Sequence, residues 1–355
     1  MRPTDGSTVE IALLIPIGGS AGIFAPSCEY CAQLAVEEIN AAGGLLGRRM
    51  NLRVLDGSQP SNVVAAQIET LVTVGEIDAV VGWHLSVVRR AVAPRIAGRV
   101  PYVYTALYEG GEHTPGVFLT GETPDVQLLP AMRWLADERG VRRWSIVGND
   151  YVWPRRTALA AHEYAQRVGA EICDELFVPL STEHFTSAIS RVLASRADGV
   201  LMLLVGADAA RFNRAFADVG LDDSCARLST LVDENTLLAS GASGTRGLCS
   251  TAGYFESLAT PESLAFGARY NARFGADAPP LNSPGQSCYE GIKLLAELIR
   301  EAGSLAVGPL VRAGGRVEYE GARGTLHLND GHVGQPIYLA EADGLHFALV
   351  SQLTA

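Results

Sequence analysis

The strongest constraint on the fold is a regular alternation between short apolar runs and longer segments with apolar residues at helical spacing. Val9 to Pro16 is a short apolar run, and Glu29 to Ala41 follows it with helical spacing. The alternation continues through Asn51 to Leu55, Asn62 to Val74 and Ile77 to Val81. Strands that alternate with helices are typical of a parallel sheet covered by helices on both faces. The sequence therefore predicts a doubly wound α/β sheet.

The same alternation restarts after Pro124 and predicts a second sheet of the same kind. At 355 residues the chain also fits two domains of about 150 to 200 residues better than one. The expected elements here are a helix to Arg139, strands at Trp144 to Val147, Ile172 to Val178 and Gly199 to Val205, and helices from Pro154, at Thr186 to Ala194 and at Ala209 to Val219. The remaining expected elements are a strand at Leu248 to Tyr254, helices at Pro261 to Phe274 and Pro284 to Ala302, and hairpin strands at Val317 to Glu320, Gly324 to Leu328, Pro336 to Ala340 and His346 to Ser351.

Three short extended segments are expected to carry the chain between the two lobes. They are Gly121 to Thr123, Gly253 to Phe255 and Asn329 to Gly331. None is long enough to be a free linker, so together they predict a three-segment hinge. The expected lobes are residues 1–121 with 255–329, and residues 122–254 with 330–355.

Composition excludes several classes of partner. The net charge is −11 with scattered Lys and Arg, which argues against nucleic acid and against an anionic membrane surface. No apolar run of about 20 residues is present, so membrane insertion is not expected. No signal peptide is visible, and the six cysteines show no disulfide spacing, which favours the cytoplasm; a chain trimmed of its leader is the alternative, and it places the protein in the periplasm.

Polar and aromatic residues gather after two neighbouring strands between Ala79 and Pro124. Ser86 stands where a helix N-cap is expected after the strand that ends at Gly82, and its hydroxyl would face the crevice at the carboxyl end of the sheet. The next strand brings Tyr104, Thr105, Ala106 and Tyr108 to the same edge. The alternative is that Ser86 only caps a helix and Tyr104 only packs. The cluster as a whole predicts a ligand site without a catalytic charge.

Sequence motifs for catalysis, cofactors and metals are missing. There is no G-x-G-x-x-G turn after the first strand, no G-x-S-x-G elbow and no G-x-x-x-x-G-K loop. Cys28 and Cys31 form one C-x-x-C without a second pair or a nearby His, so ordinary thiols are favoured over a zinc or redox site. His327 and His332 are interpreted as structural. The chain is expected to be neither an enzyme nor a holder of cofactor or metal.

Longer stretches resemble the type I periplasmic binding proteins, the family of the Leu/Ile/Val-binding proteins. The family resemblance rests on A-x-L-A-V-E-E-I-N-A-A-G-G-L-L-G-R-R at Ala32 to Arg49. Three further stretches are similar to the amide-sensor branch, which includes the aliphatic amidase regulator: S-x-x-R-R-A-V-x-P at Ser86 to Pro94, Y-E-G-G-E-H-T-P at Tyr108 to Pro115, and G-N-D-Y-V-W-P-R at Gly148 to Arg155. The resemblance covers nearly the whole chain and implies two lobes that close on a ligand.

The resemblance also implies a set of ligand-binding residues. Ser86, Tyr104 and Tyr151 fall on ligand-contacting positions, and His84 stands where the amide sensor has an aromatic residue and is expected at the entrance. The amide sensor has a threonine at the position of Ala106, whereas this chain has Thr105 one residue earlier. In the amino-acid receptors an acidic residue of the second lobe takes the ammonium group, and the matching loop, Ser229 to Asn235, contains Asp233 and Glu234.

Two functions follow from the resemblance, and both require a small polar ligand. The first is an amide-sensor-like protein that binds an aliphatic amide or urea-like compound and regulates a partner protein. The alternative is the substrate-binding protein of an ABC transporter for branched-chain amino acids, amides or urea, with a permease as partner. A homo-oligomer is compatible with either function.

Overall fold

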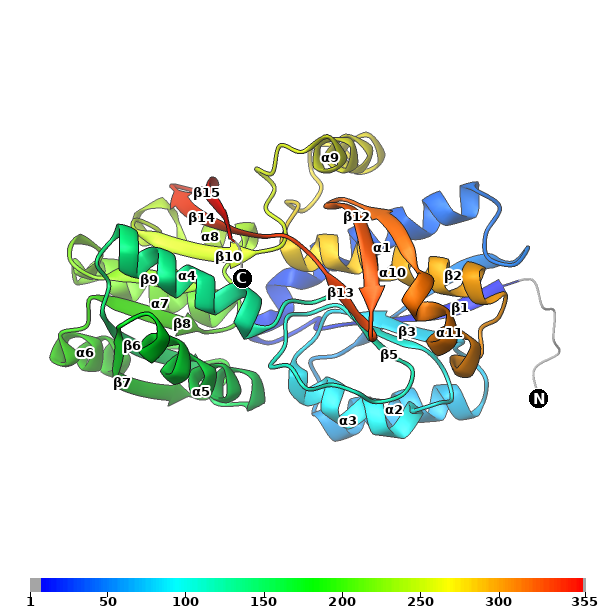
Figure 1. Ribbon diagram of the computed structural model, residues 1–355, viewed down its shortest axis with the longest axis horizontal. Coiled ribbons are helices and arrows are strands. Elements are labelled where there is room, and N and C mark those ends of the chain that lie inside the picture. The colour runs from blue at the N-terminus through cyan, green and yellow to red at the C-terminus, as the bar shows by residue number, and fades with distance from the viewer. Residues whose placement is uncertain (1–7, 354–355) are drawn as a thin grey trace.

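The computed structural model describes residues 8–353, which form two α/β lobes lying side by side (Figure 1). The first lobe contains an eight-stranded sheet in the order β11-β12-β13-β5-β4-β3-β1-β2. β1 to β5 and β13 are parallel, whereas β11 and β12 add an antiparallel edge. The strands are β1 (Thr8–Ile15), β2 (Arg49–Asp56), β3 (Ala79–Gly82), β4 (Tyr102–Tyr104), β5 (Val117–Leu119), β11 (Glu318–Gly321), β12 (Gly324–Asn329) and β13 (His332–Gly334).

Helices cover both faces of the first sheet. α1 (Ala25–Ala41) and α10 (Ser283–Ala302) pack together on one face, and α2 (Ser61–Thr73) and α3 (Ser86–Ile96) pack together on the other (Figure 1). Short 3-10 turns, η1 (Ser20–Phe24) and η4 (Gly314–Arg316), and the helices α9 (Pro261–Phe274) and α11 (Val307–Ala313) complete this lobe.

The second lobe contains a seven-stranded sheet in the order β15-β14-β10-β9-β8-β6-β7. β6 to β10 are parallel, and β14 and β15 form an antiparallel edge. The strands are β6 (Arg143–Asn149), β7 (Glu171–Val178), β8 (Gly199–Leu203), β9 (Ala226–Ser229), β10 (Leu248–Ala252), β14 (Ile337–Asp343) and β15 (His346–Leu353). α4 (Pro124–Glu138) and α5 (Val152–Arg167) cover one face; α6 (Thr186–Ser195), α7 (Ala207–Asp218), α8 (Glu234–Ser240) and the turns η2 (Leu221–Asp223) and η3 (Ala242–Gly244) lie on the other side.

The sequence prediction of two α/β lobes is confirmed, but both sheets are mixed rather than wholly parallel. The antiparallel strands come from the carboxyl-terminal hairpins, one of which adds to each sheet. The prediction missed short elements that lack a long periodic pattern, namely β5, β9, β13, α8 and α11. α1 also begins at Ala25, four residues before the expected start at Glu29, because Pro26 occupies its first turn, where the missing N–H is tolerated.

The chain passes between the lobes three times. The first passage follows β5 and the second follows β10, near the expected segments. The third was expected at Asn329 to Gly331, but this expectation was wrong because β13 pairs with β5 in the first sheet, where His332 lies opposite Leu119. The third passage therefore lies between β13 and β14, visible as the long red-orange segment in Figure 1.

Two glycines allow the backbones at the cleft to approach closely. A Cβ atom on Gly82, at the end of β3, would lie 2.0 Å from the carbonyl oxygen of Leu14. A Cβ atom on Gly121, in the first passage, would lie 1.9 Å from the carbonyl oxygen of Ala106. Any side chain at either position would force these segments apart. Within the described residues, no helix is long and apolar enough to cross a membrane.

Candidate functional site

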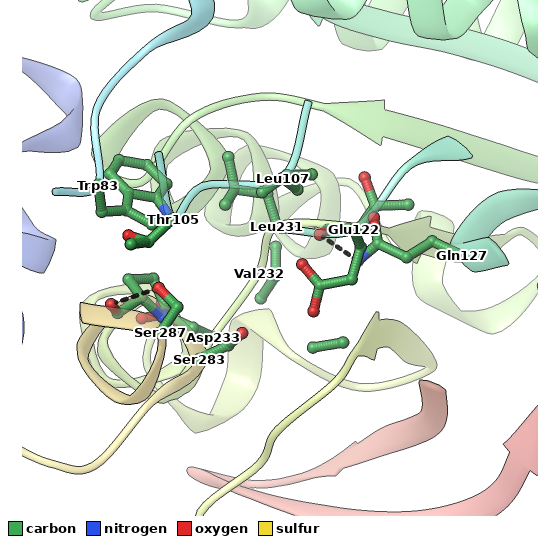
Figure 2. A pocket seen from close by; sticks show the side chains of 13 residues that line it. Trp83, Thr105, Leu107, Glu122, Gln127, Leu231, Val232, Asp233, Ser283 and Ser287 are labelled. Atoms are coloured by element: carbon green, nitrogen blue, oxygen red, sulfur yellow. Dashed lines mark hydrogen bonds between the residues drawn. The ribbon is translucent and has the colours of Figure 1, made fainter. Parts of the chain in front are cut away.

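Two small cavities lie between the lobes at the carboxyl ends of the first lobe's strands. We call the larger one the hinge-side cavity; its enclosed volume is about 20 Å³, and about 330 Å³ of empty space is counted when the part open to solvent is included. It is lined by Trp83, Thr105, Leu107, Glu122, Gln127, Thr230, Leu231, Val232, Asp233, Ala252, Ser283, Pro284 and Ser287 (Figure 2). We call the smaller one the Ser86 cavity; its enclosed volume is about 10 Å³, or about 200 Å³ with the part open to solvent. It is lined by Trp83, His84, Leu85, Ser86, Tyr104, Ala106, Leu107, Tyr151, Trp153 and Leu231. Both lobes contribute to each cavity. Trp83, Leu107 and Leu231 line both, so the two cavities adjoin one another.

Ser86 presents an unused hydroxyl to the smaller cavity. It is 2% exposed, and its Oγ lies near the hydroxyl of Tyr104 but makes no well-formed hydrogen bond to a described residue, since the Tyr104 proton goes to the carbonyl oxygen of His84. Ser86 is the first residue of α3, and Leu85 occupies the N-cap position that the sequence analysis gave to Ser86. The expectation of a capping serine was therefore wrong, because the hydroxyl caps nothing. A buried hydroxyl without a partner costs about 1 to 3 kcal/mol, which a ligand can offset by hydrogen bonding to it.

His84, expected at an entrance, is instead fully buried. Its Nε2 lies 2.7 Å from the hydroxyl of Tyr102, and its Nδ1 lies 3.2 Å from the carbonyl oxygen of Leu85. Burial lowers the pKa of His84 to about 3, so its imidazole is neutral at pH 7. Tyr104 donates its hydroxyl proton to the carbonyl oxygen of His84 at 2.7 Å. The two rings thus form the rigid floor of the Ser86 cavity.

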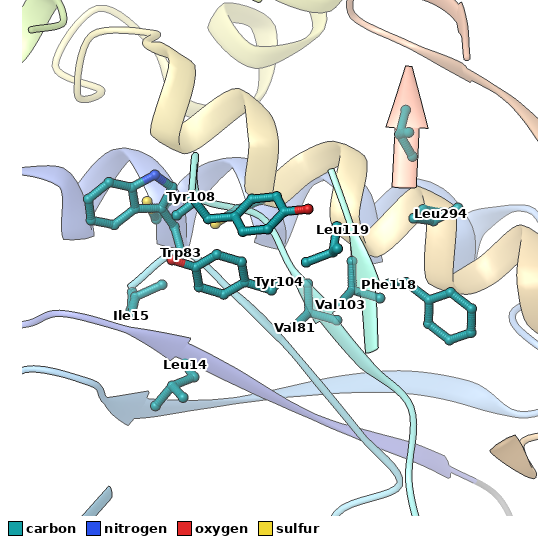
Figure 3. Packing of buried hydrophobic residues seen from close by; sticks show 14 of the residues in the cluster. Leu14, Ile15, Val81, Trp83, Val103, Tyr104, Tyr108, Phe118, Leu119 and Leu294 are labelled. Carbon is teal, nitrogen blue, oxygen red and sulfur yellow. The ribbon is translucent and has the colours of Figure 1, made fainter. Parts of the chain in front are cut away.

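Arg89 packs against Tyr104 within the first lobe. The guanidinium of Arg89 lies 5.0 Å from the ring centroid of Tyr104 and 4.9 Å from that of Tyr108. It also pairs with Glu109 at 2.8 Å and Glu112 at 3.0 Å. Figure 3 shows the side chains of Tyr104 and Tyr108 beside one another in the core of the first lobe. The conspicuous stretches at Ser86 to Pro94 and Tyr108 to Pro115 are therefore joined physically, and they hold Tyr104 in place.

Tyr151 and Ala106 also line the Ser86 cavity. Tyr151 precedes α5 and reaches the Ser86 cavity from the second lobe, with Trp153 6.2 Å away between ring centroids. Burial raises the pKa of Tyr151 well above its usual value, so it stays a neutral hydrogen-bond donor. Ala106 contributes a small apolar patch to the same wall.

Thr105 and Asp233 belong to the hinge-side cavity. The Oγ1 of Thr105 lies 3.7 Å from the Sγ of Cys288 on α10, so its hydroxyl faces away from Ser86. Asp233 caps α8: its Oδ1 accepts from Thr236 N at 2.9 Å and from Thr236 Oγ1 at 2.6 Å. Its Oδ2 accepts from Asn282 of the first lobe at 2.8 Å. Burial raises the pKa of Asp233 to about 6, and its role in this structure is an inter-lobe bond.

Several wall residues were missed by sequence reasoning. Trp83, Leu107 and Leu231 sit between the two cavities, and Glu122 reaches the larger one from the first passage between lobes. Trp83 follows directly after β3 and Leu107 comes three residues after the end of β4, so their place near the sheet edge was a usable signal. Leu231 and Glu122 lie in segments without periodicity, and only the folded structure brings them to the cleft.

The lobes are closed on one another by hydrogen bonds outside the two cavities. Ser20 of the first lobe donates to Asp208 of the second at 2.7 Å. Asn235 of the second lobe donates to the carbonyl oxygen of Ile23 at 2.9 Å and to Ser27 at 3.1 Å. These bonds require the two lobes to be in contact, so the structure represents the closed arrangement.

The match to a known family covers nearly all of the chain. Residues 8–345 match the family model described as periplasmic binding protein. The chain belongs to this family. Among its curated relatives is the Leu/Ile/Val-binding protein homolog 6 of Brucella melitensis, 27% identical over 305 residues that make up 82% of this chain and 77% of the relative.

Solved structures share the fold of this periplasmic binding protein. A solute-binding protein of an ABC transporter from R. palustris, in complex with 4-hydroxybenzoate, has a TM-score of 0.87 at 22% identity, covering 98% of this chain and 96% of that one. The branched-chain amino acid transporter substrate-binding protein LivJ of Streptococcus pneumoniae, in complex with isoleucine, has a TM-score of 0.86 at 18% identity, covering 97% and 99%. These relatives are binding proteins, in agreement with the expectation that the chain is not an enzyme.

Proposed function

We propose that this periplasmic binding protein closes its lobes on a small polar ligand and serves as the substrate-binding component of an ABC transporter, with a permease as its partner. The observation that carries the ligand proposal is the unpartnered Oγ of Ser86, buried in a cavity that both lobes line. The names of the relatives support the transport role, because they are amino-acid and solute receptors. The family description supports a periplasmic location and gives no support to the expected cytoplasmic one.

The ligand classes that we propose are aliphatic amides and urea-like compounds first, and branched-chain or similar amino acids second. The hydroxyl of Ser86 suits a carbonyl or carboxylate oxygen, and the rings of Tyr104 and Tyr151 cover an apolar part from opposite lobes. Such a ligand loses most of its water only when the lobes close, so it favours the closed arrangement. Two units move relative to one another. One is the second lobe, about residues 122–252 with 337–353, and the other is the first lobe, which is the rest of the described chain.

A second proposed role is regulation of a partner protein, as in the amide sensor. The feature that favours it is the spatial convergence of the three stretches similar to that branch: Ser86, Tyr108 and Tyr151 all surround the same cavity or its floor. Co-purification separates the two roles, since a transport protein is expected to retain a permease and a sensor is expected to retain a regulator.

A thermal-shift screen of amides, ureas and amino acids tests the ligand proposal. A true ligand raises the melting temperature because it stabilises the folded state by RT ln(1 + [L]/Kd). The best compound is then titrated against a Tyr151→Ala variant, which removes one wall of the Ser86 cavity. The control is Tyr164→Ala, a tyrosine within α5 that lines neither cavity. If none of the compound classes raises the melting temperature, the ligand proposal is refuted. If the Tyr151 variant binds with the same affinity as the wild type, the assignment of Tyr151 to the ligand site is refuted.

A further inference from the structure

The charges that line the hinge-side cavity are all negative. Glu122 and Asp233 line it, and no Lys, Arg or His side chain does. Figure 2 shows the carboxylate of Glu122 pointing into the cavity near Val232. The protein as a whole carries a net charge of −11, so its overall field adds to this sign. A ligand with a carboxylate would meet unbalanced repulsion here.

The two carboxylates differ in the number of hydrogen bonds that they accept from the protein. Asp233 accepts three hydrogen bonds, from both donors of Thr236 and from Asn282. Glu122 accepts one, from the backbone N–H of Gly253 to Oε1 at 2.8 Å. Its Oε2 receives no hydrogen bond from the part of the chain that the structure describes. Glu122 therefore keeps one whole oxygen for a ligand, whereas both oxygens of Asp233 already accept hydrogen bonds from the protein.

The nearest guanidinium does not neutralise this carboxylate fully. Arg323 pairs with Glu290 through its Nε at 2.9 Å and through its Nη2. Its Nη1 and the Oε1 of Glu122 approach the same point above Gly253, where a Cβ would lie 2.5 Å from the first and 2.9 Å from the second. The single positive charge of Arg323 thus lies near two buried carboxylates, those of Glu290 and Glu122. These three groups together carry one net negative charge beside the cavity.

An independent feature of the same cavity also indicates a ligand. Thr230 lines the cavity, is 3% exposed, and its Oγ1 has no hydrogen-bond partner. A hydroxyl in this state is an available acceptor for a second N–H of the same ligand group. We propose that the ligand carries a positively charged nitrogen group, such as an amidinium or guanidinium, which donates to Glu122 and Thr230. This inference rests on the proposed function and restricts its small polar ligand to one that carries a cationic nitrogen group.

Sets of molecules with equal shape and different charge test this inference directly. The probes are acetamide, acetamidinium and acetate, with benzamide, benzamidinium and benzoate as the larger set, each titrated by calorimetry at pH 7. Hydrogen bonds to a charged group are about twice as strong as neutral ones. At least one amidinium is therefore expected to bind about tenfold or more tightly than its amide, and the carboxylates are expected not to bind.

The Glu122→Gln variant isolates the charge, because its side-chain oxygen still accepts from Gly253 N. Its preference for the amidinium over the amide is expected to fall to about one, while Glu183→Gln, at an exposed position of the second lobe, keeps the wild-type preference. Amide or amino-acid binding without amidinium binding, or an unchanged preference in Glu122→Gln, would overturn the inference and leave the proposed function standing. Failure of every probe and every amino acid to bind would defeat both.

Discussion

The Oγ of Ser20 donates a hydrogen bond to the Oδ1 of Asp208, 2.7 Å away on the opposite lobe. The same Oγ accepts from the backbone N–H of Ser181 at 3.0 Å, and Asn149 donates to the other oxygen of Asp208 at 2.8 Å. The hydroxyl of Ser20 thus donates to one group of the second lobe and accepts from another. Neither Ser20 nor Asp208 lines the hinge-side cavity or the Ser86 cavity, so their bond stabilises closure from outside the candidate ligand site.

Replacement of Ser20 by Ala is expected to weaken ligand binding roughly 5- to 30-fold. The change removes about 1 to 2 kcal/mol from the closed arrangement only, and the observed affinity falls with the closed population. Calorimetry measures the affinity, and small-angle scattering should show a more open average shape. Ser190→Ala, on the exposed face of α6, is the control. Unchanged affinity and scattering in Ser20→Ala would contradict this prediction.

Ser86→Ala is expected to separate binding from stability. The hydroxyl is buried and makes no well-formed hydrogen bond within the described protein, so its loss should not lower the free energy of unfolding and should raise it by up to about 1 to 3 kcal/mol. Ligand binding should weaken roughly 5- to 150-fold, because a buried hydrogen bond to the ligand is lost. Ser250 is the matched comparison: its Oγ donates to the carbonyl oxygen of Val232 at 2.6 Å. Ser250→Ala should therefore destabilise by about 1 kcal/mol, and equal unfolding curves for the two variants would be inconsistent with this account.

The sequence predicted the α/β lobes because long strands and helices carry their own period. β8 is buried at all five positions and was expected from its apolar run alone. The candidate site could be located in part for a related reason: Ser86 follows β3 and Tyr104 ends β4, and the carboxyl ends of these parallel strands meet at one edge of the sheet. Glu122 and Leu231 were out of reach, since their positions depend on how the second lobe docks. Tyr104 and Thr105 line different cavities, because a one-residue step along an extended chain reverses the face to which a side chain points.

Acid is expected to destabilise the protein through His84. Its pKa falls to about 3 on folding, so the unfolded chain binds a proton below about pH 6.5 that the folded chain refuses. The stability due to neutral His84 is present above pH 6.5 and is lost as pH falls towards 3, by up to about 1.4 kcal/mol per pH unit. Asp233, whose pKa is raised to about 6, acts in the opposite direction between about pH 4 and 6.

A His84→Gln variant isolates this contribution, since the effect of Asp233 is common to both proteins. The free energies of unfolding are measured in urea between pH 7.5 and 4. The difference between wild type and variant should shift in favour of the variant by about 2 kcal/mol or more across that range. A difference that stays constant with pH would show that His84 does not titrate on unfolding.

The Arg323–Glu290 pair is expected to be essential for stability near the hinge. Both side chains are almost fully buried, at 2% and 0% side-chain exposure. Arg323→Ala leaves Glu290 charged without its partner and should destabilise by about 3 to 5 kcal/mol. Arg53→Ala breaks an exposed pair with Glu76 and should cost less than about 1 kcal/mol. Urea unfolding curves compare the two variants, and similar midpoints would count against a dominant role for the buried pair.

The third passage between the lobes has a consequence for the order in which the chain can assemble during synthesis. β6 to β10, between residues 143 and 252, leave the ribosome as one uninterrupted block. β1 to β5 are made earlier, yet α10, which covers one face of their sheet together with α1, ends only at Ala302, and the edge strands β11 to β13 come later still. Domains fold as units once their core residues are present. The first lobe is begun first, but its core is therefore completed only after strands β6 to β10 of the second lobe have been made. Its uncovered apolar sheet face is therefore the surface most in need of a chaperone before the chain is finished.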